Sequence, residues 1–285
     1  MSRIVVLGEV MVDVVARLSG PVAEGSDAPA SISVGGGGSA ANVAAWLAFA
    51  GAPATLVARV GDDEFGALAR AQLALDARLA TDPNLPTGTC IVLVAPGGER
   101  SMVPDPGANA ALSPDDLPDE LFSAGDHLHV SGYSLVRPGP RPAALSAISR
   151  ARAAGMSVSV DPASAALLSP EFLALASGAD LLLPNSVEVE ALGGVVALAD
   201  RFPEVVVKLG AEGALWTNGS DEERVPAAPM PAAALDTTGA GDAFAAGLLA
   251  ARLRGASPRE ALTAGCELAA RAVVTLGARP PVRSA

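Results

Sequence analysis

Short apolar runs recur along the chain, with stretches of helical spacing between them. Residues 4–7 (IVVL) form a continuous apolar run, which is typical of a strand covered on both faces. The alternation of such runs with helical patterns predicts an α/β fold with a mostly parallel central sheet and helices on both faces. The other predicted strands lie at residues 54–58, 90–94, 127–130, 157–160, 181–183 and 205–207, and helices are predicted at 40–50, 64–75 and 143–154.

Ser-Pro pairs predict the starts of three further helices, at Ser113, Ser169 and Ser257. Serine can cap the free amides at a helix start, and proline fits the first helical position, where no donor is needed. Ser257 is followed three residues later by Glu260, as in a capping box. The charged residues 221–224 (DEER) predict a solvated turn.

Two segments, near residues 14–34 and 87–103, depart from the alternation. They contain short extended runs and turn residues such as those at 96–98 (PGG), but no helix signal. They predict either β excursions that cover one end of the sheet or ordinary surface loops. No linker divides the chain, so residues 1–285 are predicted to form a single domain.

Composition and charge exclude several classes of protein. Hydrophobic residues make up 50% of the chain, which excludes disorder, and a net charge of −12 argues against nucleic-acid or anionic-membrane partners. The two cysteines, Cys90 and Cys266, form no CxxC pair, so a thiolate zinc site is not expected. Lys208 is the one lysine, and because Leu209 follows it there is no Walker A loop.

Residues 28–58 carry no charged side chain, so their length would permit a membrane span. The segment contains the glycine run 35–38 and a central Asn42, and its apolar residues are mostly alanine, which favours a buried helix instead. The N-terminus becomes acidic at Glu9, too early for a secretory signal. We therefore expect a cytoplasmic protein with no membrane partner.

Residues 236–244 (DTTGAGDAF) carry the clearest chemical signal. Gly239, Ala240 and Gly241 form a tight turn before a helix, and their amides can hold a phosphate oxygen at its positive end. Asp242 follows in the first helical turn, close to any group bound there. An isolated GxGD also fits a plain turn in which Asp242 only complements the helix dipole.

Five motifs in order give this signal its specificity. They are residues 37–44 (GGSAANVA), 60–66 (VGDDEFG), 185–188 (NSVE), 207–213 (VKLGAEG) and 236–247 (DTTGAGDAFAAG). With them the sequence resembles the ribokinase-like (PfkB) family of ATP-dependent sugar kinases over nearly the whole chain. The resemblance implies a ribokinase-like fold with a small β lid, ATP and Mg²⁺ as cofactors, and transfer of the ATP γ-phosphoryl group to a hydroxyl of a small carbohydrate.

The resemblance also implies roles around the phosphates. Asp242 is implied as the catalytic base, with Gly239, Ala240 and Gly241 as the anion hole, a division that suits phosphoryl transfer. Glu188 is implied to orient Mg²⁺ through waters, although with Asn185 it also fits a helix capping box. The implied nucleotide-binding residues are Asn185, Lys208, Gly210, Gly213 and Thr238, and Cys266 stands where the family places a small or amide side chain beside adenine.

On the acceptor side the resemblance implies a sugar site. A carboxylate and an amide can each bind two neighbouring hydroxyls, and glycines let the ligand approach the backbone. The implied acceptor-binding residues are Asp13, Gly37, Gly38, Asn42 and Arg100. The two β excursions are implied to form a lid that excludes water, and lid pairing between subunits makes a homodimer possible.

The sequence leaves alternatives open for the identity of the acceptor and for the class of reaction. Neither lid segment contains an aromatic residue, which favours a sugar over a nucleoside. Arginines could bind a second phosphate, so a nucleoside kinase and a sugar-phosphate kinase both stay open. A weak GxGxxA match at residues 35–40 gives little support to a dinucleotide-binding oxidoreductase. The candidate arginines are Arg17, Arg59, Arg100 and Arg137; His127 and His129 are predicted to pack or to line a rim.

Overall fold

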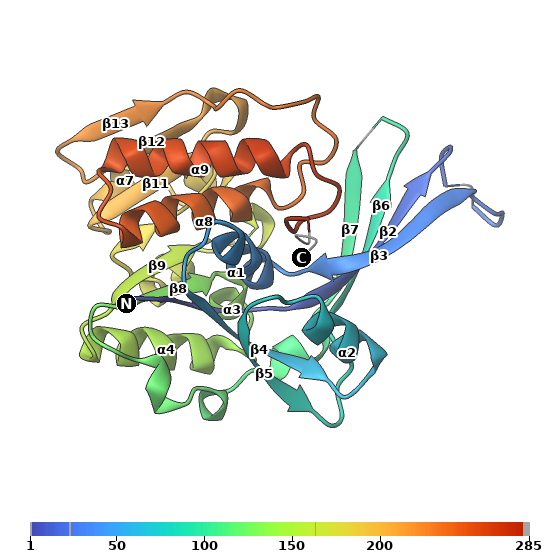
Figure 1. Ribbon diagram of the computed structural model, residues 1–285, viewed down its shortest axis with the longest axis horizontal. Helices are drawn as coiled ribbons and strands as arrows, with labels where there is room; N and C mark the ends of the chain where they lie inside the picture. The colour runs from blue at the N-terminus through green and yellow to red at the C-terminus, as the bar shows by residue number, and fades with distance from the viewer. Residues whose placement is uncertain (1, 23, 98, 163, 282–285) are drawn as a thin grey trace.

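The computed structural model describes residues 2–22, 24–97, 99–162 and 164–281 and contains two β-sheets (Figure 1). The strands of the larger sheet are β1 Ile4–Leu7, β4 Ala54–Gly61, β5 Asp76–Asp82, β8 His127–Ser131, β9 Ser157–Asp161, β10 Leu181–Leu182, β11 Glu204–Lys208, β12 Ala214–Thr217 and β13 Glu222–Val225. Their order is β13-β12-β11-β10-β9-β8-β1-β4-β5, and all neighbours pair in parallel except at β12 and β13.

Helices cover both faces of this sheet (Figure 1). In β1, Ile4 and Val6 belong to the core that contains α1, α8 and α9, while Val5 and Leu7 belong to the core that contains α4. Both sets are buried, which explains why the strand is apolar at every position. The helices are α1 Ser39–Phe49, α2 Glu64–Ala71, α3 Tyr133–Val136, α4 Arg141–Ala153, α5 Glu171–Leu175, α6 Ser186–Ala191, α7 Val195–Ala199, α8 Ala240–Leu253 and α9 Pro258–Ala272. The predicted fold class is confirmed.

The second sheet stands at one side of the molecule, at the right of Figure 1. Its strands are β2 Met11–Leu18, β3 Ala30–Gly37, β6 Thr89–Val94 and β7 Arg100–Asp105, in the order β3-β2-β6-β7. The prediction of β excursions is confirmed, although Ala23 and Gly98 lie outside the described residues. The apolar run 90–94 belongs to this sheet, where Cys90, Val92 and Val94 are buried on one face.

Of the three helix starts that Ser-Pro pairs predict, the one at Ser113 was wrong and the one at Ser169 differs by one position. After Ser113 the chain makes only a 3₁₀ turn, Pro114–Asp116, because Pro118 disfavours the helical conformation at Leu117. Ser169 does not cap α5, since Pro170 occupies the cap position and the helix begins at Glu171. Ser257 caps α9 in the predicted capping box with Glu260.

The predicted turn at 221–224 was also wrong, because Glu222–Val225 forms the edge strand β13, paired with β12. Edge strands commonly carry charged side chains, so a polar run does not exclude pairing. The uncharged stretch 28–58 is divided among β3, α1 and β4. Within the described residues, none of the helices combines the length and apolar character that crossing a membrane requires.

Candidate active site

Polar side chains gather at the carboxyl ends of the parallel strands, the edge at which open α/β sheets bind ligands. Glu9 follows β1, Ser131 ends β8 and Asp161 ends β9, and all three are buried. The Ser131 hydroxyl donates to Glu9 Oε1 at 3.1 Å, which joins neighbouring strands. Lys208 ends β11 at the same edge. The sheet therefore supplies a polar floor for a site.

Helix α8 begins above this floor at a glycine turn. Gly239 has a φ of +74°, and a Cβ there would lie 2.5 Å from the carbonyl oxygen of Ala278, so the position requires glycine. The Ala240 amide donates to the Thr237 carbonyl at 3.3 Å and closes the turn. Within the described chain the amides of Gly239 and Gly241 donate to no atom. Two of the three predicted anion-binding amides are thus open to a ligand at the positive helix end.

Asp242 lies in the first turn of α8 and is held by α1. Its Oδ1 accepts a hydrogen bond from the Ser39 hydroxyl and its Oδ2 accepts one from Asn42 Nδ2, both at 2.8 Å. Desolvation of the carboxylate raises its pKa to about 7, while these two hydrogen bonds oppose the shift. A carboxylate that ionises near neutral pH is suited to act as a general base.

The glycine run makes room for two polar groups. A Cβ at Gly37 would lie 2.1 Å from Asp13 Oδ1, and a Cβ at Gly38, where φ is +88°, would lie 2.6 Å from the carbonyl oxygen of Glu9. Gly35, on the same strand, has open space around it. Gly37 and Gly38 are therefore required by close approach, and Gly37 fixes where Asp13 can lie.

Arg279 packs against the same run from the C-terminal segment. Its Nη2 donates to the Gly37 carbonyl at 2.8 Å, and a Cβ at Gly36 would lie 2.1 Å from Nη1. Burial raises the pKa of Asp13 to about 6, and the positive charge of Arg279 opposes that shift. Asp13 is thereby kept ionised over most of the neutral range.

Lys208 lies between two carboxylates beside the glycine turn. Its Nζ donates to Asp161 Oδ2 at 2.6 Å, and a Cβ at Gly241 would lie 3.6 Å from Nζ. Burial alone would lower the pKa of Lys208, but the charges of Asp161 and Glu188 raise it above its usual value. The cluster places a permanent positive charge next to the open amides of α8.

Glu188 and Asn185 form the predicted capping box at the start of α6. Asn185 Oδ1 accepts from the Glu188 amide at 2.9 Å, and Glu188 Oε2 accepts from the Asn185 amide at 2.8 Å. Burial raises the pKa of Glu188, and the nearby Asp161 adds to the rise. Magnesium keeps most of its waters and takes phosphate oxygens, so two carboxylates suffice to hold it. Glu188 and Asp161 fit such an ion.

A cavity of about 430 Å³ opens on one side of the turn. Three of the five predicted nucleotide-binding residues line it: Lys208, Gly210 and Gly213. The remaining lining is mostly apolar, which suits the flat face of a base. It includes Thr237, Ala240 and Gly241 of the turn together with Met230, Phe244, Cys266 and Val273.

A second cavity, of about 200 Å³, lies between the sheet edge and the small sheet. It is lined by the predicted acceptor residues Asp13, Gly38 and Asn42 and by Met102 of β7. Thr238, predicted on the nucleotide side, lines this cavity instead. Because neighbouring residues of one turn border different cavities, the turn separates a nucleotide-sized space from a sugar-sized one. Asp242 links the two linings, because it follows Gly241 in the sequence and accepts hydrogen bonds from Ser39 and Asn42.

The whole chain, residues 1–285, matches the profile described as "pfkB family carbohydrate kinase". The chain belongs to this family. It is similar to an ATP-dependent ribose-1-phosphate kinase of Halopiger xanaduensis (33% identity, covering 92% of this chain and 88% of the relative) and to a fructokinase of Klebsiella pneumoniae (34%, 75% and 76%). Its structure is similar to that of adenosine kinase from Sinorhizobium meliloti, with a TM-score of 0.87 at 27% identity. The match covers 99% of this chain and 96% of the adenosine kinase chain. The protein is an ATP-dependent carbohydrate kinase, as the sequence predicts.

Arg100 of the kinase does not line the acceptor cavity. Its Nη2 lies 2.8 Å from Asp236 Oδ1, and its Nη1 donates to the Thr237 hydroxyl at 3.0 Å. Arg17 of β2 lies 3.6 Å from the same carboxylate. These contacts tie the small sheet to the residues that precede the catalytic turn.

The sequence alone assigns no role to five residues of the kinase site: Glu9, Ser39, Asp161, Arg279 and Tyr133, which lines the acceptor cavity. Asp161 had a usable signal, because it directly follows a predicted strand and precedes Pro162. Ser39 had none, since its partner Asp242 is 203 residues away in the sequence. Only the packing of α1 against α8 reveals that contact.

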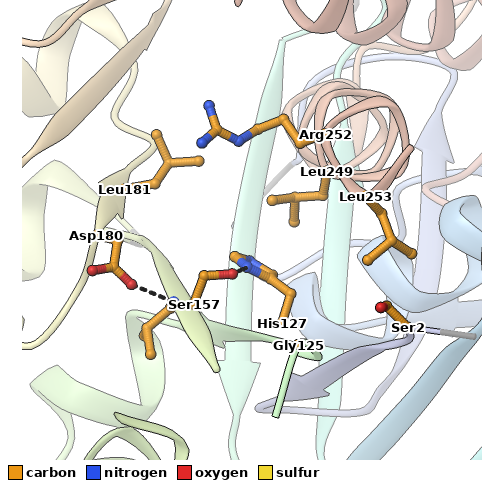
Figure 2. Close-up of a pocket in the computed structure, with 10 residues that line it drawn as sticks. Ser2, Gly125, His127, Ser157, Asp180, Leu181, Leu249, Arg252 and Leu253 are labelled. Atoms are coloured by element: carbon orange, nitrogen blue, oxygen red, sulfur yellow. Dashed lines mark hydrogen bonds between the residues drawn. The ribbon is translucent and has the colours of Figure 1, made fainter. Parts of the chain in front are cut away.

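A third cavity, of about 230 Å³, lies at the amino ends of β8 and β9, the edge of the sheet opposite the kinase site (Figure 2). There His127 Nδ1 lies 2.7 Å from the Ser157 hydroxyl, and the Ser159 hydroxyl lies within 2.8 Å of both histidine rings. Burial lowers the pKa of His127 and of His129 to about 3, so both rings are neutral. Their predicted packing and rim roles fit this geometry.

Proposed function

We propose that the protein transfers the γ-phosphoryl group of ATP to a hydroxyl of a small carbohydrate, with Asp242 as the base. The observation that carries this proposal is the placement of the Asp242 carboxylate. It directly follows Gly241 of the nucleotide cavity and is held at 2.8 Å by Ser39 and by Asn42, both of the acceptor cavity. A carboxylate with a pKa raised to about 7 takes up a hydroxyl proton more readily than an ordinary aspartate.

In the proposed reaction Asp242 accepts the proton of the acceptor hydroxyl. That oxygen then forms a bond to the γ-phosphorus, the bond to the bridging oxygen breaks, and ADP leaves with the electron pair. In this reaction the open amides of Gly239 and Gly241 and the Lys208 ammonium beside Gly241 would stabilise the negative charge that develops on the phosphoryl oxygens. The protein thus mainly positions the reactants and stabilises charge.

Mg²⁺ is part of the proposal, with Glu188 and Asp161 as the residues that would hold it. When bound, the ion neutralises phosphate charge and orients the phosphates for in-line attack. Asn185 fixes both oxygens of Glu188, with Nδ2 donating to Oε1 at 2.7 Å and the amide to Oε2. The carboxylate is therefore already oriented in the protein alone.

We propose that the small sheet acts as a lid over the acceptor and that residues 1–285 form one domain with it. Met11, Cys90 and Met102 line the acceptor cavity from this sheet, so they would exclude water from the transferred group. The ion pair between Arg100 and Asp236 supports a closed position of the lid. Because Arg100 contacts the turn rather than the cavity, its proposed role is indirect.

The proposal is tested by measuring ADP release with a panel of neutral sugars, sugar phosphates, sugar acids and nucleosides. We expect turnover with at least one sugar-derived acceptor. The names of two relatives, a ribose-1-phosphate kinase and an adenosine kinase, make a sugar phosphate and a nucleoside the alternatives. The cavity volume of about 200 Å³ favours a sugar over a nucleoside, and so does its cover, because the small sheet carries no aromatic residue and the aromatic side chain in the lining is Tyr133 of α3. Turnover with nucleosides alone would contradict the proposal.

The acid limb of the pH–rate profile should depend on Ser39. Because Asp242 must be ionised to accept a proton, kcat/KM should rise with pH with a midpoint near 7. The Ser39 hydroxyl stabilises the ionised form, so Ser39→Ala should raise the pKa and move the midpoint upward by roughly one unit. Ser177→Ala, at an exposed position, is the control. An unchanged or lower midpoint in Ser39→Ala would contradict this role.

We propose that the kinase is a homodimer joined through the outer faces of its small sheets. Val14, Val34, Ile91 and Val103 stand side by side in the strand register, and the last three are 47–58% exposed. A row of exposed apolar side chains on a sheet is typical of a buried interface. Both described cysteines are free, which supports the cytoplasmic location that we also propose.

Light scattering should therefore give the mass of a dimer for the wild type and of a monomer for Ile91→Glu, because a charge cannot be buried in an apolar interface. Val196→Glu on α7, where the side chain is 73% exposed, is the control and should leave the mass unchanged. A monomeric wild type, or a dimeric Ile91→Glu, would exclude this interface.

A further inference from the structure

The acceptor cavity presents an excess of hydrogen-bond acceptors. Glu9 Oε2 and Asn42 Oδ1 are both buried and have no partner among the described residues. The carboxylate of Asp13 likewise makes no hydrogen bond or close ion pair there. Buried acceptors without partners are costly unless a ligand satisfies them. The cavity is therefore built for a ligand that donates several hydrogen bonds, as a polyhydroxy compound does.

Arg137 is the cation among the residues that line this cavity. It follows α3 and its guanidinium lies 5.4 Å from the centre of the Tyr133 ring. In the described part of the chain this guanidinium makes no hydrogen bond and no close ion pair. An arginine beside a cavity with free donors is suited to bind a planar or tetrahedral anion at two points.

The other candidate arginines are already engaged. Arg59 pairs with Asp82 at 3.0 Å and with Asp116 at 2.9 Å, and Arg100 pairs with Asp236. Arg17 also lies near Asp236. Of the four arginines that the sequence offers for an anionic substituent, the structure thus leaves Arg137 without a carboxylate partner and inside the cavity.

Glu9 is not a close ion-pair partner of the Arg137 guanidinium. The positive charge of Arg137 lowers the pKa of Glu9, but burial outweighs it and raises that pKa overall. Glu9 Oε1 is bound by the Ser39 amide at 2.9 Å and by the Ser131 hydroxyl, without help from the guanidinium. The cavity also contains Asp13, whose carboxylate would repel an anionic ligand if no cation were present.

We infer that Arg137 binds an anionic substituent of the acceptor, so that the preferred acceptor is a sugar carrying a phosphate or carboxylate group. This inference rests on the proposed kinase function and names the substrate class of the same site. Phosphate and carboxylate share the chemistry that a guanidinium recognises, with two oxygens in one plane. Glu9, Asn42 and Asp13 would accept hydrogen bonds from the hydroxyl groups of the same molecule.

The test compares matched acceptor pairs with the full-length enzyme and ATP: ribose against ribose 1-phosphate, and a neutral hexose against a hexonic acid. We expect the wild type to show a higher kcat/KM for an anionic member, and the pair that shows it identifies the group. Arg137→Gln should lower the ratio of anionic to neutral kcat/KM by about 10- to 100-fold, mainly through KM. Arg137→Lys, which keeps the charge, should recover part of the ratio.

Arg78→Gln is the control, because it removes the same charge from an exposed side chain on β5, outside the cavity. It should leave the ratio unchanged. A wild type that phosphorylates only neutral sugars, or an Arg137→Gln enzyme with an unchanged ratio, would overturn the inference while the kinase function stands. Absence of ADP release with every acceptor would instead overturn the kinase function itself.

Discussion

Replacing Asp242 with asparagine should lower kcat by roughly 10²–10⁴-fold, the usual contribution of a positioned general base. Asparagine keeps the shape of the side chain and can still contact Ser39 and Asn42, but it cannot take up the acceptor proton. The cavity of about 430 Å³ does not depend on this carboxylate for its lining. The dissociation constant of an ATP analogue, measured by calorimetry, should therefore change little.

Asp200→Asn, at an exposed position after α7, is the matched control and should retain the wild-type rate. Equal melting temperatures of the two variants would show that folding is preserved. If Asp242→Asn kept the full rate, the base would have to be another group. If it lost nucleotide affinity to the same extent as rate, Asp242 would be a binding residue and not the base.

Replacing Gly37 with alanine should raise the acceptor KM by roughly tenfold or more, because a displaced carboxylate loses charge-assisted hydrogen bonds to sugar hydroxyls. The added methyl group would lie 2.1 Å from Asp13 Oδ1, so the Asp13 side chain must move. The ATP KM should stay close to that of the wild type, since Gly37 does not line the nucleotide cavity. Steady-state kinetics with either substrate varied separates the two effects.

Gly35→Ala supplies a control two residues away on the same strand and the same face. A Cβ at Gly35 meets nothing within 4 Å, so this variant should have wild-type kinetics. Equal effects of the two substitutions would mean that strand flexibility, and not the position of Asp13, limits the reaction. A selective effect of Gly37→Ala on the ATP KM would contradict the assignment of the acceptor cavity.

The fold was largely predictable because parallel strands covered on both faces must be apolar at nearly every position. The run 4–7 illustrates this, since all four residues of β1 are buried. Strands at the sheet edge escape the rule. Residues 221–224 predict a turn, whereas Glu222–Val225 forms a strand, because an edge strand that faces water carries no apolar requirement. The pairing of β2 with β6, whose partners such as Val12 and Thr89 are 77 positions apart, also left no local signal.

The site was predictable where one continuous motif builds it. Residues 236–244 contain both the glycine turn and Asp242, and in the structure Gly239 caps α8 while Asp242 lies in its first turn. Contacts between distant segments could not be read from the sequence. The bond from Ser39 to Asp242, the packing of Arg279 on Gly36 and the ion pair of Arg100 with Asp236 all depend on tertiary packing. Their chemistry is ordinary, but their partners are set by the fold.

A crystal structure of the enzyme with a non-hydrolysable ATP analogue, Mg²⁺ and a sugar acceptor tests the central claim most directly. The account predicts the terminal phosphate within hydrogen-bond distance of the Gly239 and Gly241 amides, and an acceptor hydroxyl in contact with Asp242. The adenine ring of the ATP analogue should occupy the apolar cavity beside Phe244 and Cys266. A terminal phosphate bound away from the glycine turn, or an acceptor with no hydroxyl at Asp242, would contradict it.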